Sequence, residues 1–231
     1  MARPFQRLRD LAEDQWGLVT LEQARAAGVA RSSVSRLTAN GLLERVAQGV
    51  YRLRGSAEPD LLALRAAWLQ LDPGRPAWAR LEDEDTALVS HASAAVVYGV
   101  GDLRADVHEF TLPHRRQSRR PDVRLHRDQV PAGQRIVLHG LPVTRAARMI
   151  GDLVGDHIDP GGVAQIVRDV LDAVYDYPAA VAEQLAPYAA RFGFRRGDGL
   201  ALLNEFLMRS NHRHRDELVA EARAGLERVP A

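Results

Sequence analysis

The stretch GLVTLEQARAAGVARSSVSRLTANGLLERVAQGVYRL, residues 17–53, determines the expected fold of the first part of this chain. Thr20 stands where a helix N-cap is needed, and the short helical pattern after it ends at Gly28, a helix-terminating glycine. Upstream, apolar residues with helical spacing predict an earlier helix that stops before Gly17. The apolar stripe of this first helix consists of Leu8, Leu11, Ala12 and Trp16.

The next helical pattern buries Val34 and Leu37 and ends at Asn40-Gly41, a pair that accepts positive φ. Two strand-like runs, LLERV and GVYRL, follow directly and are separated by residues 47–49. Two helices, a turn, a third helix and a hairpin form the order of a winged helix-turn-helix. In that fold the third helix enters the major groove of DNA and the hairpin, called the wing, lies along the backbone.

The outward face of the third helix carries small hydroxyl groups and arginines. Small side chains let a helix backbone approach DNA closely, and Arg31 and Arg36 can then reach guanine edges or phosphates. The alternative is a merely solvated helix start, but the wing at the expected distance favours DNA binding. The candidate DNA-binding residues are Arg31, Ser32, Ser33, Ser35 and Arg36 on the helix and Arg45, Gln48 and Arg52 in the wing, whereas Val50 and Tyr51 are expected in the core.

Residue usage and charge narrow the classes of function. The 31 basic residues are all arginine, which excludes a phosphate-loop, Schiff-base or nuclease lysine, and the absence of cysteine excludes a thiolate nucleophile and a cysteine zinc site. Residues 1–56 hold nine arginines against five acidic residues, whereas residues 57–105 hold four against eight. The basic first part therefore suggests a polyanionic partner. No apolar run is long enough to span a bilayer and no secretory signal is evident, so a cytoplasmic protein without a membrane partner is expected.

The rest of the chain predicts a second domain of mixed structure. We expect an α+β fold with a winged helix-turn-helix domain over residues 1–56 and a C-terminal domain over residues 60–231, joined by a linker. The second domain is expected to be mixed α/β to about residue 155 and helical afterwards. Thr144 is expected to cap the helix RAARMIGDLVG. The predicted strands of the second domain are ALVS, VHEFTL, VRLHR and the runs 135–138 and 141–143.

A second basic cluster lies between two of these strands, in the loop PHRRQSRRP. It could bind a second stretch of DNA or an acidic surface on a protein partner, or it could be the solvated tip of a hairpin that charge keeps soluble. The residues of this possible patch are Arg115, Arg116, Arg119 and Arg120.

Catalytic and metal-binding motifs do not stand out. There is no HExxH motif, and the close pair His212 and His214 lacks a third evident ligand. Ser90 adjoins His91, but sequence adjacency does not make a nucleophile and base, and no GxSxG elbow is present. A nuclease could be imagined around Asp102, Asp106 and Glu109, yet the missing lysine and the lack of a paired carboxylate motif argue against it. We expect no catalytic residue, no metal and no cofactor.

Three segments together resemble the AbiEi-type antitoxins: the string over residues 17–53, SHASAAVVYGV and GLPVTRAARMIGDL, which with their surroundings span roughly residues 5–155. The resemblance implies a bacterial type IV toxin–antitoxin system acting in phage defence. Its antitoxin represses its own operon by binding inverted repeats and counteracts a nucleotidyltransferase toxin encoded beside it. It also implies that the N-terminal domain binds DNA and the C-terminal domain neutralises the toxin, with or without direct contact. Carried over by position, Ser32, Ser33, Ser35 and Arg36 would face the DNA, supported by Arg31, Arg45 and Arg52.

A second class of function stays open beside the antitoxin interpretation. The middle domain could bind a small molecule and alter DNA affinity, which would make the chain a ligand-responsive winged-helix regulator. A ligand-dependent rise in melting temperature would favour that class. Metal-dependent cleavage of DNA would favour a nuclease.

Overall fold

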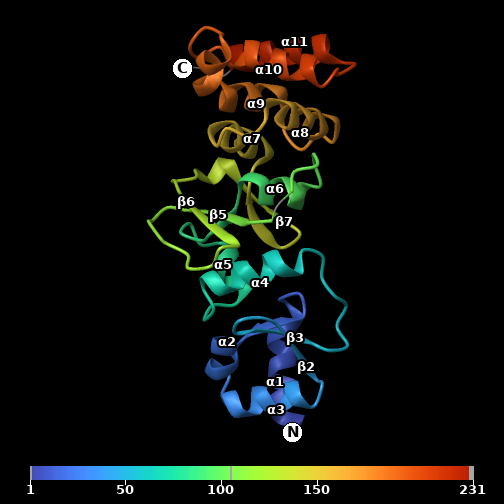
Figure 1. Ribbon diagram of the computed structural model, residues 1–231, viewed down its shortest axis with the longest axis vertical. Coiled ribbons are helices and arrows are strands. Elements are labelled where there is room, and N and C mark those ends of the chain that lie inside the picture. Colours follow the sequence, from blue (N-terminus) through green and yellow to red (C-terminus); the bar gives the residue numbers. More distant parts are fainter. Residues whose placement is uncertain (1, 105, 229–231) are drawn as a thin grey trace. The chain divides into compact units, whose positions relative to one another are not determined.

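The computed structural model describes residues 2–104 and 106–228 (Figure 1). The chain folds into two compact units, Met1–Ala87 and Leu88–Ala231, which we call the N-terminal and C-terminal units. The predicted α+β class, a winged helix-turn-helix followed by a mixed and then helical part, is confirmed. The division falls later in the chain than the expected boundary at residues 56–60.

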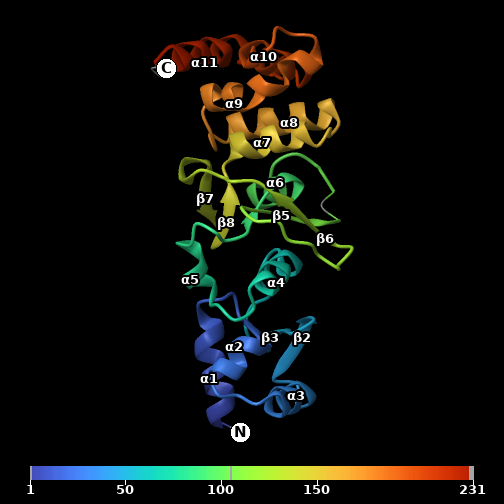
Figure 2. The same ribbon diagram turned by 90° about the vertical axis from the view of Figure 1, so that its left-hand side faces the viewer.

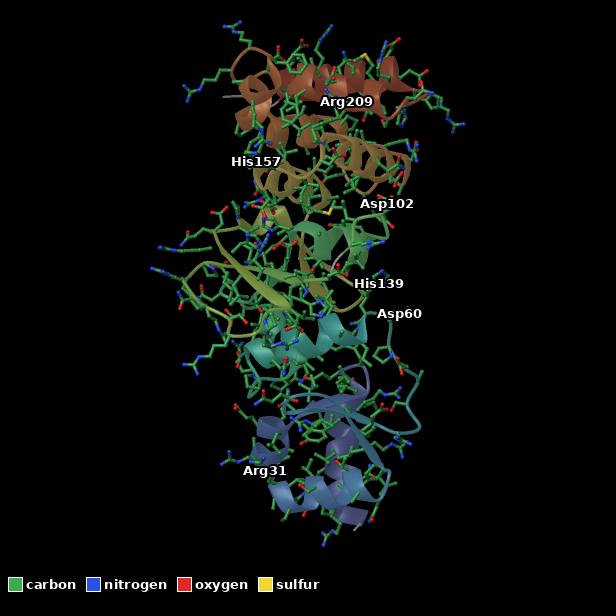
Figure 3. The ribbon with its side chains drawn as sticks, in the orientation of Figure 1. Arg31, Asp60, Asp102, His139, His157 and Arg209 are labelled. Carbon is green, nitrogen blue, oxygen red and sulfur yellow. The ribbon has the colours of Figure 1, made fainter. Side chains whose placement is uncertain are left out.

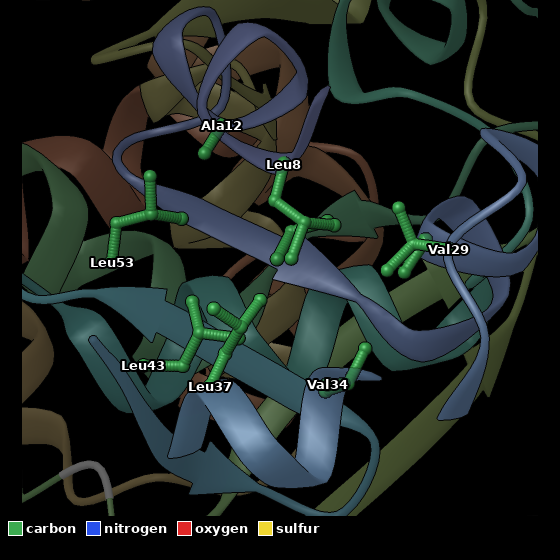
Figure 4. Packing of buried hydrophobic residues seen from close by; sticks show 9 residues of the cluster. Leu8, Ala12, Val29, Val34, Leu37, Leu43 and Leu53 are labelled. Atoms are coloured by element: carbon green, nitrogen blue, oxygen red, sulfur yellow. The ribbon is translucent and has the colours of Figure 1, made fainter. Parts of the chain in front are cut away.

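The N-terminal unit begins with the winged helix-turn-helix. Its three strands form an antiparallel sheet of order β1-β3-β2, in which β2 and β3 make the wing. Leu8, Val34, Leu37 and Leu43 bring α1, α3 and β2 together in one buried cluster (Figure 4). The elements are α1 (Ala2–Glu13), β1 (Leu18–Thr20), α2 (Leu21–Ala26), α3 (Arg31–Ala39), β2 (Leu43–Ala47) and β3 (Val50–Leu53).

Two of the predicted helix signals act as expected, and one does not. The Thr20 hydroxyl accepts a hydrogen bond from the Gln23 backbone amide at 3.0 Å, which caps α2, and Gly28 follows α2 with φ +74°. Trp16, however, is not part of the first helix. Helix α1 ends at Glu13, and Trp16 lies in the following turn with φ +57°. The helical spacing of the apolar residues predicted a helix that reaches Trp16, but the Trp16 ring packs on Trp68, and local spacing cannot show a contact with so distant a residue.

That ring packs against α4 (Leu62–Leu71), which together with α5 (Ala77–Leu81) completes the N-terminal unit. The centroids of the Trp16 and Trp68 rings lie 6.0 Å apart in an edge-to-face arrangement. Gln70 Nε2 of α4 donates to the Gln48 carbonyl in the wing at 2.7 Å. The residues after the expected linker therefore pack on the winged helix, which explains why the division follows Ala87.

Two glutamines link the helix-turn-helix to the segment between α4 and α5. Gln15 and Gln23 hydrogen-bond to each other at 2.9 and 3.0 Å. Gln15 Oε1 accepts from the Ala77 amide at 2.9 Å, and Gln23 Nε2 donates to the Arg75 carbonyl at 2.9 Å. The Thr20 hydroxyl also donates to the Pro73 carbonyl. Residues 73–77 thus fix the start of α2.

A fragment of residues 1–87 is therefore expected to be more stable than a fragment of residues 1–56 by at least about 2 kcal/mol. The shorter fragment lacks the hydrogen bonds from residues 70–77, each of which contributes about 0.5–1.5 kcal/mol. Urea denaturation followed by circular dichroism at 222 nm measures both. Equal stabilities would show that α4 and α5 do not belong to the folding unit of the winged helix.

The C-terminal unit contains a five-stranded mixed sheet of order β6-β5-β4-β8-β7, followed by helices. In both views α7 and α8 lie between this sheet and α10 and α11 (Figures 1 and 2). The strands are β4 (Leu88–Val89), β5 (His108–Leu112), β6 (Val123–Arg127), β7 (Arg135–Leu138) and β8 (Leu141–Thr144), and the helices are α6 (His91–Tyr98), η1 (Ala132–Gln134), α7 (Ala146–Gly155), α8 (Pro160–Asp172), α9 (Pro178–Leu185), η2 (Ala186–Phe192), α10 (Gly199–Arg209) and α11 (Arg215–Arg228).

The pairing of β5 with β6 does not agree with the alternative that the loop PHRRQSRRP is the tip of a hairpin. The two strands run parallel, with His108 opposite Val123 and Leu112 opposite Arg127. Since parallel neighbours need a connection that returns along the strand, the arginine-rich loop is a crossover and not a hairpin tip. Strand propensity in the sequence does not reveal direction.

The expected cap of α7 is also wrong. Thr144 lies in β8, fully buried, and its hydroxyl makes no hydrogen bond within the described residues. Arg145 occupies the N-cap, and the carboxylate of Asp176 accepts from the Ala147 amide at 3.1 Å and from Arg145 at 2.6 Å. A residue distant in sequence therefore satisfies the start of α7, a contact that no local pattern could predict.

Candidate nucleic-acid interface

The third helix is anchored by its apolar face and open on its polar face. Val34 and Leu37 are 1% and 2% exposed, and both belong to the winged-helix core. The opposite face presents side chains to solvent, and Figure 3 labels Arg31 at the start of α3, on the outside of the unit. Arg31, Ser32, Ser35 and Arg36 are exposed and Ser33 is partly buried.

The described part of the chain does not neutralise the charge of this face. No acidic residue occurs in α3, and neither Arg31 nor Arg36 has a salt-bridge partner among the described residues. Ala30 at the N-cap has no side-chain acceptor to satisfy the first amides of the helix. Thr38 is occupied, because its hydroxyl donates to the Val34 carbonyl at 3.0 Å. The face thus offers two guanidinium groups and helix N-terminal amides, both of which attract phosphate.

The wing presents Arg45 and Gln48. Arg45 is exposed on β2, and its Nε donates to the Ala47 carbonyl at 3.4 Å, close to a register shift in the β2–β3 pairing. Gly49 makes the turn with φ +71°, a conformation that favours glycine. The Gln48 side chain is exposed, while its carbonyl accepts the hydrogen bond from Gln70. Helix α4 therefore fixes the wing tip.

Arg52 differs from the other wing arginine. Its side chain is 15% exposed, and its guanidinium lies 2.7 Å from Glu44 and 3.3 Å from Glu58. The hydrogen bond and charge of Arg52 hold the pKa of the Glu44 carboxyl below its usual range. Arg52 thus joins β2, β3 and the following segment, and its charge is balanced. Val50 is buried as expected, and Tyr51 packs against the core.

The second basic cluster lies in the C-terminal unit, on the crossover between β5 and β6. Arg115, Arg116 and Arg119 are exposed. Arg120 is partly buried and pairs with Asp122, its Nε donating to Oδ1 at 2.9 Å. Arg120 is therefore less accessible to a partner than the other three arginines of the loop.

Sequence reasoning missed the buried and supporting side chains that position the candidate interface through hydrogen bonds. The signal for one of them was present, since Thr20 followed three residues later by Gln23 is a capping box, and Gln23 Oε1 accepts from the Thr20 amide at 3.0 Å. No signal marked Gln15 or Gln70, because their partners are distant in sequence.

The fold and the exposed basic helix define a winged helix-turn-helix of the kind that transcriptional regulators carry. Residues 6–54 match the family model described as a transcriptional regulator, AbiEi antitoxin. The match supports an AbiEi-type antitoxin and indicates an antitoxin or transcriptional regulator; it covers the winged helix, not the C-terminal unit. No curated protein matches the chain. Within the described residues, no helix combines the length and apolar character needed to cross a bilayer.

Proposed function

We propose that this protein is the antitoxin of a type IV, AbiE-like toxin–antitoxin system, that it represses its own operon by binding inverted repeats in promoter DNA, and that it counteracts a nucleotidyltransferase toxin. The observation that supports DNA binding most strongly is the uncompensated positive face of α3 beside a firmly anchored wing. The family match to an antitoxin and transcriptional regulator supports the wider role. The family is typically non-enzymatic, which supports an antitoxin without a catalytic site.

The proposed interface assigns separate tasks to the candidate residues. Arg31 and Arg36 contact base edges or phosphates. Arg45 and Gln48 contact the backbone from the wing, and Arg52 positions the wing through its ion pairs. The small residues Ser32, Ser33 and Ser35 let α3 approach the groove closely.

The C-terminal unit is proposed to carry the antagonism of the toxin. The exposed arginines of its crossover loop, Arg115, Arg116 and Arg119, provide positive charge for a second contact with DNA or for an acidic partner surface.

Fluorescence anisotropy of the full chain on a duplex from upstream of its own gene, against a shuffled duplex at several salt concentrations, tests DNA binding. Selective binding that falls steeply with salt is expected, because neutralised phosphates release counterions. Equal, weak binding to both duplexes would contradict autoregulation and leave the basic face as a general charge patch.

Arg45→Ala is expected to weaken binding to the operator and to the shuffled duplex about equally. Loss of one phosphate contact should also reduce the slope of log affinity against log salt concentration by about 1. The same anisotropy titrations measure both effects. A selective loss on the operator alone would instead place Arg45 at a base edge.

A further inference from the structure

The C-terminal unit contains a buried polar group that the proposed DNA interface does not use. We call it the histidine cluster; it consists of His91, Glu109, His126 and Asp156, with Arg124 at its edge. These residues come from the start of α6, from β5 and β6, and from the end of α7. Parallel pairing places Glu109 opposite Arg124 and Thr111 opposite His126, so alternation directs Glu109 and His126 to the same face of the sheet.

The two imidazole rings of the cluster are stacked. The centroids of His91 and His126 lie 3.6 Å apart, with the ring planes 12° from parallel. Nε2 of His91 is 4.0 Å from Oδ2 of Asp156. One ligand atom from each of His91, His126 and Asp156 can be chosen so that all three atoms lie within 4.8 Å of one another. Two ring nitrogens and a carboxylate oxygen thus lie close together.

The backbone of His91 is strained. His91 is 6% exposed and has φ +51°, a region that residues with side chains rarely adopt and that is often retained at functional sites. Its Nδ1 lies 3.0 Å from the Ser90 hydroxyl, which leaves Nε2 directed toward Asp156.

We propose that His91, His126 and Asp156 bind a divalent transition metal ion of the zinc class, with Glu109 orienting the ring of His126. Two imidazoles and a carboxylate are donors that zinc accepts. Glu109 Oε1 lies 3.2 Å from Nε2 of His126, and a carboxylate hydrogen-bonded to a histidine is the usual outer support of such a ligand. Glu109 is fixed in turn by the Ala92 amide, which donates to Oε2 at 3.0 Å.

Metal binding requires three movements. Ligand atoms around tetrahedral zinc lie about 3.4 Å apart, so the gap between His91 and Asp156 must close slightly and the stacked rings must tilt, because each imidazole binds a metal in its own plane. The Arg124 guanidinium must also leave, since its Nη1 lies 3.6 Å from Asp156 and 3.5 Å from Glu109. Its side chain is 61% exposed and can move into solvent, and the adjoining cleft of about 280 Å³ gives room.

The proposed ion would tie α6, β6 and the end of α7 together, and so would stabilise the C-terminal unit independently of DNA binding. It would replace the expectation of no metal drawn from the sequence. That expectation considered only local spacing, whereas the three ligands lie far apart along the chain. Glu109 was among the acids considered for a nuclease; here it supports a ligand.

The full chain, stripped of metal with a chelator, is titrated with Zn²⁺ by calorimetry and with Co²⁺ by visible absorption. We expect one equivalent of Zn²⁺ to bind and to raise the unfolding midpoint measured by circular dichroism at 222 nm. The three tryptophans, at positions 16, 68 and 78, all lie in the N-terminal unit. The midpoint measured by their fluorescence is therefore expected to stay unchanged.

Variants assign the ion to the cluster. Glu109→Gln is expected to weaken Zn²⁺ binding about 10- to 100-fold. Asp156→Asn and His126→Gln should weaken Zn²⁺ binding at least as much. Circular dichroism of the metal-free variants tests whether they fold. Asp156 lies at the end of α7 with its side chain 35% exposed, so its substitution is the milder test of folding.

The matched control removes the other histidine pair of the C-terminal unit. His212 and His214 pair with Asp172 and Glu217, with ring centroids 6.3 Å apart. The double variant His212→Gln/His214→Gln is expected to keep the bound equivalent. The proposal would be overturned if the unchanged chain failed to bind Zn²⁺, or if Asp156→Asn and His126→Gln bound Zn²⁺ as tightly as the unchanged chain. Loss of the bound ion in the double variant alone would also overturn it.

Discussion

Arg36→Ala is expected to weaken binding to the operator by about 1–3 kcal/mol, roughly 5- to 150-fold in Kd. Arg36 projects from the exposed face of α3 and has no ion-pair partner among the described residues, so its guanidinium is available for a bidentate base contact. Leu37 beside it anchors the helix in the core, and the substitution leaves that anchor untouched. Anisotropy with operator and shuffled duplexes measures the loss and the change in selectivity.

Arg223→Ala is the matched control for this experiment. Arg223 is an exposed arginine on α11 of the C-terminal unit, so its removal changes the net charge equally without touching α3. It is expected to leave operator affinity within about twofold. Arg36→Ala should retain antagonism of the toxin, since Arg36 lies in the N-terminal unit and its removal leaves the C-terminal unit unchanged. Operator binding by Arg36→Ala equal to that of the control would remove Arg36 from the interface.

Trp68→Ala is expected to destabilise the N-terminal unit by about 3–5 kcal/mol, the range found when a buried large aromatic residue is truncated. Trp68 is fully buried, and its Nε1 donates to the Ala87 carbonyl at 2.7 Å. The guanidinium carbon of Arg80, itself 2% exposed, lies 3.5 Å from the centre of the Trp68 ring. Truncation therefore leaves a cavity and strips a buried cation of its aromatic partner.

Urea denaturation followed by the fluorescence of the remaining tryptophans measures this loss, with Trp78→Ala as the control. Trp78 is 64% exposed, so its removal is expected to change the free energy of unfolding by less than about 0.5 kcal/mol. Operator binding by Trp68→Ala should weaken as the wing loses its support from α4. A Trp68→Ala variant as stable as Trp78→Ala would show that α4 is dispensable to the winged helix.

Much of the candidate DNA interface follows from local sequence. Thr20, Gly28 and the pair Asn40-Gly41 determine where helices begin and end, because capping and positive φ involve only residues a few positions apart. The alternation of apolar residues places Val50 in the core and Arg45 outside it. The candidate residues on α3 could be identified for the same reason, since a helical period places Val34 and Leu37 opposite them.

The order of elements and the polar face of α3 could therefore be predicted, since both depend on short-range periodicity and capping. Contacts between distant groups could not: the balancing of Arg52 by Glu58, the capping of α7 by Asp176, the parallel direction of β6 and the packing of Trp16 on Trp68. The same holds for the histidine cluster, whose members lie on four separate elements. Burial and hydrogen bonding between distant segments are settled only when the whole chain packs, and no local pattern encodes them.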